Sequence, residues 1–129
     1  MDRRSGAVVA GSSVLPVVLL LSLLGCGRSP VYCPAYVGAG LSVQVTNAAT
    51  GQPICDATVV ASEGSYSEGL FENACQFTGA YGRPGTYVVS ASRAGFVSPR
   101  TTSARVIMGG GDCPQVVMVR LKIELTPER

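Results

Sequence analysis

The feature that most constrains the fold of this chain is a series of short segments in which apolar and polar residues alternate. The clearest is residues 117–125, where five apolar residues alternate with Met118, Arg120, Lys122 and Glu124. A period of two residues is typical of a strand with one buried face. We expect five further strands, at residues 41–46, 57–62, 74–81, 86–93 and 101–108. No stretch after residue 26 has the period of an amphipathic helix, so the sequence predicts an all-β fold.

Turn-forming residues separate these segments. Glycine and proline occur at residues 50–53, 82–85 and 109–112, where tight reversals need the backbone freedom of glycine or the fixed φ of proline. Residues 63–73 have no clean period and are predicted to be a long loop, with room for a seventh strand at a sheet edge. The sequence therefore predicts an antiparallel Greek-key β-sandwich of about seven strands.

The first 25 residues differ from the rest of the chain and are typical of an export signal. A basic start precedes a long uncharged stretch, and residues 14–24 form its densest apolar run. That run is shorter than the roughly 20 residues that span a bilayer. The alternative is an uncleaved anchor, because residues 6–27 carry no charge. Both interpretations place the rest of the chain outside the cytoplasm.

The residues that follow, Leu23-Leu24-Gly25-Cys26, resemble the lipobox of bacterial lipoproteins. In that family a peptidase cuts before the cysteine, whose thiol is diacylated before the new amino terminus is acylated. The resemblance implies a signal peptide at residues 1–25 and a lipid anchor on Cys26, and several acyl chains hold a protein stably at a membrane. Gly27 after the cysteine implies the outer membrane. Residues 26–40 are expected to be a lipidated tether.

Once Cys26 is assigned to lipid, four cysteines remain for the exported domain. Their spacing and the absence of histidine favour two disulfides over a zinc site. If every connection reverses the chain direction, Cys55 and Cys113 lie at one end of the sandwich, and Cys33 and Cys75 at the other. Because a disulfide cannot join Cα atoms much more than about 7 Å apart, we expect the pairs Cys55–Cys113 and Cys33–Cys75.

The composition excludes several classes of function. The chain has 129 residues, a formal net charge of +2 and no histidine. Nucleic-acid binding needs clustered cations, whereas eight basic and seven acidic residues are spread over the chain after residue 25. Histidine is the commonest general base and metal ligand, and disulfide-bonded cysteines are not nucleophiles. We expect no enzymatic activity, no cofactor, no bound metal and no nucleic-acid partner.

The long loop contains the candidate ligand-binding residues. Tyr66, Phe71 and the nearby Tyr81 are suited to stack on a sugar, although core packing explains most aromatic residues in a chain of this kind. Three glutamates of the same loop carry the oxygen donors that Ca²⁺ prefers, but their irregular spacing is more typical of a solvated loop. Four further arginines are candidates for a basic stripe that faces anionic lipid or polysaccharide: Arg93, Arg100, Arg105 and Arg120. The simpler explanation for these charges is that they protect strand edges from pairing with other sheets.

Several segments resemble the carboxypeptidase regulatory-like domain, a transthyretin-like sandwich. They are Val43-Gln44-Val45-Thr46, Thr50-Gly51-Gln52-Pro53-Ile54, Asp56-Ala57-Thr58-Val59, and Arg83-Pro84-Gly85-Thr86-Tyr87-Val88-Val89-Ser90-Ala91 with Gly95-Phe96. The resemblance covers roughly residues 41–125 and leaves residues 126–129 as a tail. It concerns turn and packing positions, so it implies a fold and indicates almost nothing about activity; similar domains accompany peptidases, outer-membrane receptors and surface proteins without being catalytic themselves. One transthyretin-like branch hydrolyses hydroxyisourate with histidines, which this chain lacks.

These observations predict a non-catalytic lipoprotein of the bacterial cell envelope. Its β-sandwich is expected to be a structural or protein-interaction module, held at the membrane by its lipid anchor and in contact with an envelope protein. The alternative is a carbohydrate-binding module that uses residues 63–73 to hold a glycan.

Overall fold

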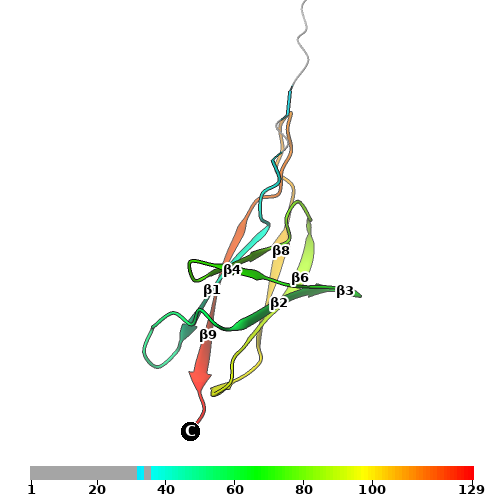
Figure 1. Ribbon diagram of the computed structural model, residues 1–129. Helices are drawn as coiled ribbons and strands as arrows, with labels where there is room; N and C mark the ends of the chain where they lie inside the picture. The colour runs from blue at the N-terminus through cyan, green and yellow to red at the C-terminus, as the bar shows by residue number, and fades with distance from the viewer. Residues whose placement is uncertain (1–31, 34–35) are drawn as a thin grey trace, which may run out of the picture. The chain divides into compact units, whose positions relative to one another are not determined.

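The computed structural model describes residues 32–33 and 36–129. The expected signal peptide, the lipidation site Cys26 and part of the expected tether lie outside these residues. Cys33–Arg129 form one compact unit, whose regular structure is nine β-strands (Figure 1). Within the described ranges there is no helix that is long and apolar enough to cross a bilayer.

The strands form two sheets, which confirms the predicted all-β sandwich. In spatial order, one sheet contains β4 (Phe71–Asn73), β5 (Gln76–Gly79), β1 (Leu41–Asn47), β9 (Val119–Pro127) and β7 (Phe96–Val97), and the other contains β3 (Tyr66–Gly69), β2 (Thr58–Glu63), β6 (Gly85–Ser92) and β8 (Arg100–Val106). Neighbouring strands are antiparallel, as expected, except β1 and β9, which pair in parallel over seven residues. The sheet that contains β1 is therefore mixed.

The hydrophobic core lies between the two sheets and is made by the alternating residues of the strands. Tyr87 on β6 and Phe77 on β5 are its largest members, with 0% and 2% of their surface exposed. β1 and β9 contribute the inward residues Leu41, Val43, Val45, Ile123 and Leu125. Val119 and Leu121, at the beginning of β9, also point inward but are only half-buried. The predicted buried face of the last strand is thus the inner face, and it is covered less completely toward its beginning.

Residues 63–73 were predicted to be a long loop with room for one edge strand; the loop is wrong, because these residues contain two strands, β3 and β4, and each lies at the edge of its sheet. β3 pairs with β2 in one sheet and β4 pairs with β5 in the other, so the chain changes sheets at Leu70. The N–H of Leu70 donates to the carbonyl oxygen of Val59 at 2.8 Å. Two strands of four and three residues in different sheets do not produce one continuous alternation, so the sequence pattern does not reveal them.

The disulfides join Cys33 to Cys113 and Cys55 to Cys75, with Cα–Cα distances of 5.5 and 4.6 Å. The predicted pairing of Cys55 with Cys113 and of Cys33 with Cys75 is therefore wrong. The prediction assumed that the chain passes directly from β2 into the strand that follows Cys75, in the opposite direction. Instead, β3 and β4 together cross the length of the sandwich between β2 and β5, so β5 runs in the same direction as β2. As a result β5 runs antiparallel to β1 and begins near the end of β1, which places Cys75 near Cys55. The same extra run brings the end of β8, and Cys113 after it, to the end where Cys33 lies.

The folded unit extends beyond the expected boundaries of residues 41–125. Ala39 is buried, and the N–H of Gly40 donates to the carbonyl oxygen of Ala80 at 3.1 Å. A Cβ on Gly40 would lie 2.7 Å from that oxygen, so this position has no space for a side chain. Cys33 belongs to the same unit, and β9 continues to Pro127.

Candidate functional site

The structure separates the three aromatic residues of the predicted ligand site. Tyr66 on β3 is half-buried, whereas Phe71 and Tyr81 are 68% and 53% exposed. The Tyr81 hydroxyl lies 2.9 Å from Oγ1 of Thr78, and Thr78 is the cross-strand partner of Phe71. Phe71 and Tyr81 therefore flank Thr78 on the outer face of one sheet, and Tyr66 belongs to a different environment.

The alternation over residues 74–81 predicts that Tyr81 lies on the same side as Phe77, and this is wrong. Ala80 has a φ of 53°, a left-handed conformation that interrupts the strand period. Ala80 is consequently buried, with 1% of its surface exposed, and Tyr81 points outward.

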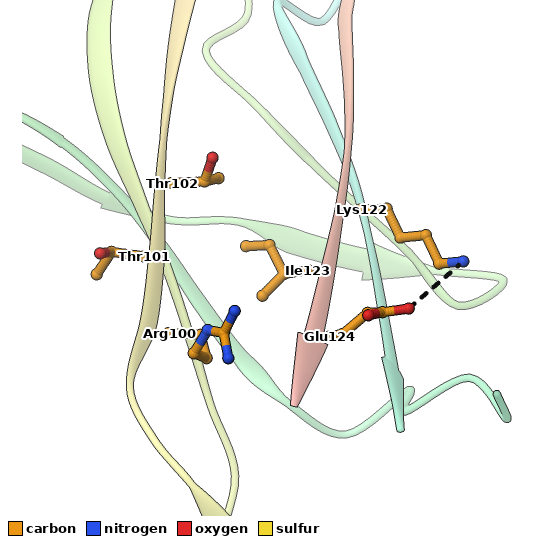
Figure 2. Close-up of a pocket in the computed structure, with 6 residues that line it drawn as sticks. All are labelled: Arg100, Thr101, Thr102, Lys122, Ile123 and Glu124. Carbon is orange, nitrogen blue, oxygen red and sulfur yellow. Dashed lines mark ion pairs between the residues drawn. The ribbon is translucent and has the colours of Figure 1, made fainter. Parts of the chain in front are cut away.

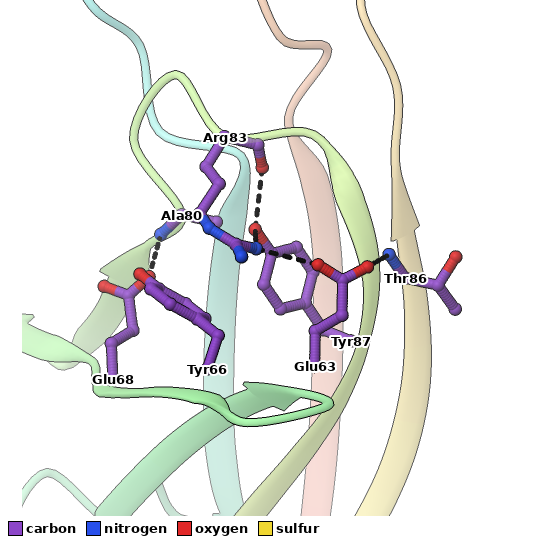
Figure 3. A network of polar contacts seen from close by, with 7 residues as sticks. All are labelled: Glu63, Tyr66, Glu68, Ala80, Arg83, Thr86 and Tyr87. Atoms are coloured by element: carbon purple, nitrogen blue, oxygen red, sulfur yellow. Dashed lines mark hydrogen bonds and ion pairs between the residues drawn. The ribbon is translucent and has the colours of Figure 1, made fainter.

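A polar cluster around Arg83 holds Tyr66 in place (Figure 3). The Arg83 guanidinium carbon lies 3.6 Å above the centre of the Tyr66 ring, and Nη1 donates to Oε1 of Glu63 and to the Tyr87 hydroxyl, both at 2.9 Å. The Tyr87 hydroxyl in turn donates to the main-chain oxygen of Arg83 at 2.8 Å, and Oε2 of Glu63 accepts from the N–H of Thr86 at 2.7 Å. Because these groups satisfy one another, the cluster stabilises the end of the sandwich, and the Arg83 guanidinium covers one face of the Tyr66 ring.

The glutamates of residues 63–73 are each engaged separately. Glu63 belongs to the Arg83 cluster. Oε1 of Glu68 accepts from the Tyr66 hydroxyl at 2.8 Å, and Oε2 of Glu72 accepts from the N–H of Cys75 at 2.9 Å. No group of three or more potential metal ligands occurs in the residues that the structure describes.

These contacts shift the acidities of the cluster in the directions that their geometry requires. The N–H of Thr86, followed by the Arg83 guanidinium, holds the pKa of Glu63 below its ordinary value of 4.5. The hydrogen bond to the Tyr87 hydroxyl, followed by that to Glu63, raises the pKa of Arg83. The hydrogen bond to Glu68 raises the pKa of the Tyr66 hydroxyl.

We expect Glu63→Gln to flatten the acid limb of the stability profile. A carboxylate whose pKa is lower in the folded than in the unfolded state stabilises the fold above its unfolded pKa, and this stabilisation is lost as the pH falls through the folded pKa. The wild-type protein should lose stability as the pH falls below about 4.5, and the variant should lose less over that window while being less stable at pH 7. Urea midpoints between pH 7 and pH 3 measure this. Parallel profiles for the two proteins would contradict it.

The surface carries an uncovered edge of β9, beside β8, which is itself an edge strand of the other sheet. β7 pairs with β9 only at Pro127 and Thr126, after which the chain passes through Ser98 and Pro99 to the other sheet and continues there as β8. Within the described ranges no strand covers residues 119–125 on that side. We call this edge the β9 notch. It spans seven residues, or about 20 Å at the rise of a strand.

The main-chain groups of the β9 notch are available for pairing. The N–H of Val119 donates to the carbonyl oxygen of Gly40 on the β1 side at 2.8 Å. Main-chain groups alternate in direction along a strand, so the N–H and C=O groups of Arg120, Lys122 and Glu124 point into the notch.

A groove of about 260 Å³ lies between β8 and β9 beside the notch (Figure 2). Ile123 and Arg100 point into it from the two strands, whereas Lys122 and Glu124 point away. The Lys122 Nζ lies 3.9 Å from Oε2 of Glu124. The volume is small for a drug-sized ligand.

The predicted basic stripe is divided by the fold. Arg93 forms a two-point ion pair with Asp56, at 2.7 and 2.9 Å, which lowers the pKa of Asp56. Arg100, Arg105 and Arg120 lie on β8 and β9, the two strands that border the groove, and make no ion pair within residues 32–33 and 36–129. Of these three, Arg100 points into the groove (Figure 2) and Arg120 lies on the outer face of β9 at the notch, whereas Arg105 lies on the outer face of β8.

No protein-family model matches this chain, and no curated protein sequence matches it. The candidate site therefore depends on geometry alone.

The sequence pattern does not indicate the β9 notch, although it places Lys122 and Glu124 correctly on the polar face of the last strand. One signal was present: Pro99 interrupts the apolar and polar pattern between Phe96 and residue 101, and proline in a strand region marks an edge or a break. The pattern does not indicate that the two sides of the break belong to different sheets.

Proposed function

We propose that this protein is a non-catalytic lipoprotein of the bacterial cell envelope whose sandwich binds a partner protein by strand addition at the β9 notch. The lipobox-like Leu23-Leu24-Gly25-Cys26 supports the lipid anchor, and the segments similar to the carboxypeptidase regulatory-like domain support a binding role over catalysis. The single observation that carries the binding mode is the uncovered main chain of β9 beside an open groove.

Strand addition is supported by the way the chain leaves this edge unfinished. β7 begins the covering of β9 and then departs to the other sheet. On the opposite side of the sandwich the chain also changes sheets, at Leu70, but β3 and β4 cover their neighbours almost completely. An extended segment from a partner gains main-chain hydrogen bonds at such an edge and gains specificity from alternate side chains.

Crosslinking from within the notch in intact cells tests the proposal. A photoreactive side chain in place of Lys122 should give covalent adducts with an envelope protein. The same side chain at Phe71, which is also exposed but lies on another surface, should give few or none. Cys26→Ser should remove the protein from the membrane fraction and abolish the adduct. Adducts of equal yield from both positions would refute a specific role for the notch.

The second candidate function is glycan binding on the sheet face that carries Phe71 and Tyr81. Its specific support is the pair of exposed aromatic rings around the Thr78 hydroxyl, since aromatic surfaces beside polar groups suit sugars. Tyr66 is engaged elsewhere and does not contribute. If the face that carries Phe71 and Tyr81 binds glycan, Phe71→Ala should abolish retention of the protein on cell-envelope polysaccharide. The same substitution should leave the crosslink from position 122 unaffected.

A further inference from the structure

Building on the proposed strand addition, we infer that the segment received by the β9 notch is acidic, alternates carboxylate and apolar side chains, and runs antiparallel to β9. The inference deepens the proposed function by specifying the chemistry and direction of the partner. It rests on the charges of β8 and β9, the half-buried apolar residues behind the notch and the direction of β7.

The charge of the two strands that border the groove is strongly one-sided. β8 and β9 carry four cations and one carboxylate, whereas the remaining described residues carry three cations and six carboxylates. Lys122 has Glu124 as its neighbour, but Arg100, Arg105 and Arg120 have no acidic partner in the described part of the chain. Carboxylates on the outer face of an added strand would supply a partner for Arg120 and a further one for Lys122, since opposite charges directly across two strands attract.

The side chains of β9 predict the alternation of the partner. Arg120 and Lys122 are exposed on the outer face, and Val119 and Leu121 are half-buried on the inner face. A strand paired with β9 places its own side chains alternately on these two faces. Carboxylates at every second position would lie near Arg120 and Lys122, and apolar residues between them would complete the burial of Val119 and Leu121.

The direction follows from β7, which already occupies one end of the same edge. β7 is antiparallel to β9, with Val97 opposite Thr126. At the other end, residues 107–117 form a hairpin that joins β8 to β9, in which the N–H of Val117 donates to the carbonyl oxygen of Ile107 at 2.8 Å. A segment that continues the line of β7 fills the space between these limits.

Two other occupants fit the charges less well. A second copy paired through its own notch would repeat the same excess of cations and would bring only one carboxylate, Glu124, to the four cations of β8 and β9. Residues 1–31 of the chain itself contain three arginines and a single acid, Asp2, so they offer no series of carboxylates. An acidic segment of another protein is therefore the occupant that the surface favours.

Titration of the purified full chain, held in detergent, with synthetic peptides tests the inference. The probes are labelled peptides of about nine residues, long enough to span the notch at about 3.3 Å per residue, in which valine alternates with aspartate, asparagine or lysine. We expect fluorescence anisotropy to show binding of the aspartate peptide at least about tenfold tighter than that of the asparagine peptide, and no binding of the lysine peptide. Proline at the positions that face β9 should abolish binding of the aspartate peptide, because it removes the main-chain donors.

Variants of the protein locate the site. Arg120→Gln combined with Lys122→Gln should weaken binding of the aspartate peptide about tenfold or more. Arg93→Gln, which removes a cation that is already paired with Asp56, should leave it unchanged. Equal binding of the asparagine and aspartate peptides would overturn the acidic preference while leaving strand addition intact. Binding of the aspartate peptide that persists with proline would overturn strand addition itself.

Competition experiments exclude the remaining occupants. Phosphatidylglycerol vesicles and an anionic polysaccharide should compete with the aspartate peptide only weakly. Competition as effective as that of unlabelled peptide would overturn the inference in favour of a general polyanion surface. Sedimentation that shows a dimer dissociated by the peptide would overturn it in favour of a second copy of this chain.

Discussion

Replacing Cys33 and Cys113 together by serine is expected to lower the free energy of unfolding by about 4 to 5 kcal/mol. This disulfide joins residues 80 positions apart, so its loss releases nearly the whole folded unit in the unfolded state. The stability of a domain of this size is typically about 5 to 15 kcal/mol, so the variant should be close to unfolding at physiological temperature. Urea unfolding followed by far-ultraviolet circular dichroism measures the change.

The matched control is the double serine variant of Cys55 and Cys75, which carries the same number of substitutions. Its disulfide spans 20 positions, and its loss is expected to cost about 3 kcal/mol. Peptide mapping of the oxidised wild-type protein should find Cys33 joined to Cys113. A greater loss from the Cys55 and Cys75 variant, or a map with another pairing, would contradict the role assigned to the long-range disulfide.

Tyr87→Ala is expected to destabilise the fold by about 3 to 5 kcal/mol, because truncation of a buried aromatic side chain leaves a cavity in a well-packed core. Tyr87 is fully buried and is one of the largest residues of the core. Its loss also removes the hydroxyl that accepts from the Arg83 guanidinium and donates to the Arg83 carbonyl. Chemical unfolding at pH 7 gives the change in free energy.

Two further variants distinguish the contribution of the Tyr87 ring to stability from that of its hydroxyl and from the general effect of a substitution in β6. Tyr87→Phe keeps the packing and should cost about 1 kcal/mol, the usual contribution of a hydrogen bond. Val88→Ala changes the next residue of the strand, which points outward and is 49% exposed, and should change stability by less than about 1 kcal/mol. A loss from Tyr87→Phe as large as that from Tyr87→Ala would show that the polar cluster, rather than the core, dominates.

The parts of the fold that depend on local patterns could be predicted from the sequence. Residues 117–125 alternate over a full strand, and their inner residues Ile123 and Leu125 are indeed in the core. The beginning of β1 at Leu41 and the turn after it follow from the alternation before Thr50 and from Gly51, whose φ is 78°. Such features are encoded by a few consecutive residues, so they can be read without knowledge of the rest of the chain.

The candidate site was much less predictable. Tyr66, Phe71 and Tyr81 were grouped because they are close in sequence, but the change of sheet at Leu70 separates Tyr66 from Phe71, and the left-handed conformation of Ala80 turns Tyr81 outward. Arg100 and Lys122 were recognised as exposed charges. Their position on either side of one groove depends on two strands that come from different sheets.

The sequence alone therefore determined that this protein is built from strands and which face of its last strand is buried, because alternation between burial and exposure is a property of each strand. The tertiary structure alone decided the disulfide pairing and the existence of the β9 notch. Both depend on where the chain crosses between the sheets, at Leu70 and at Ser98 and Pro99. A crossing is chosen by the packing of distant segments against one another, and neither its place nor its consequence for the far end of the chain appears in a local pattern.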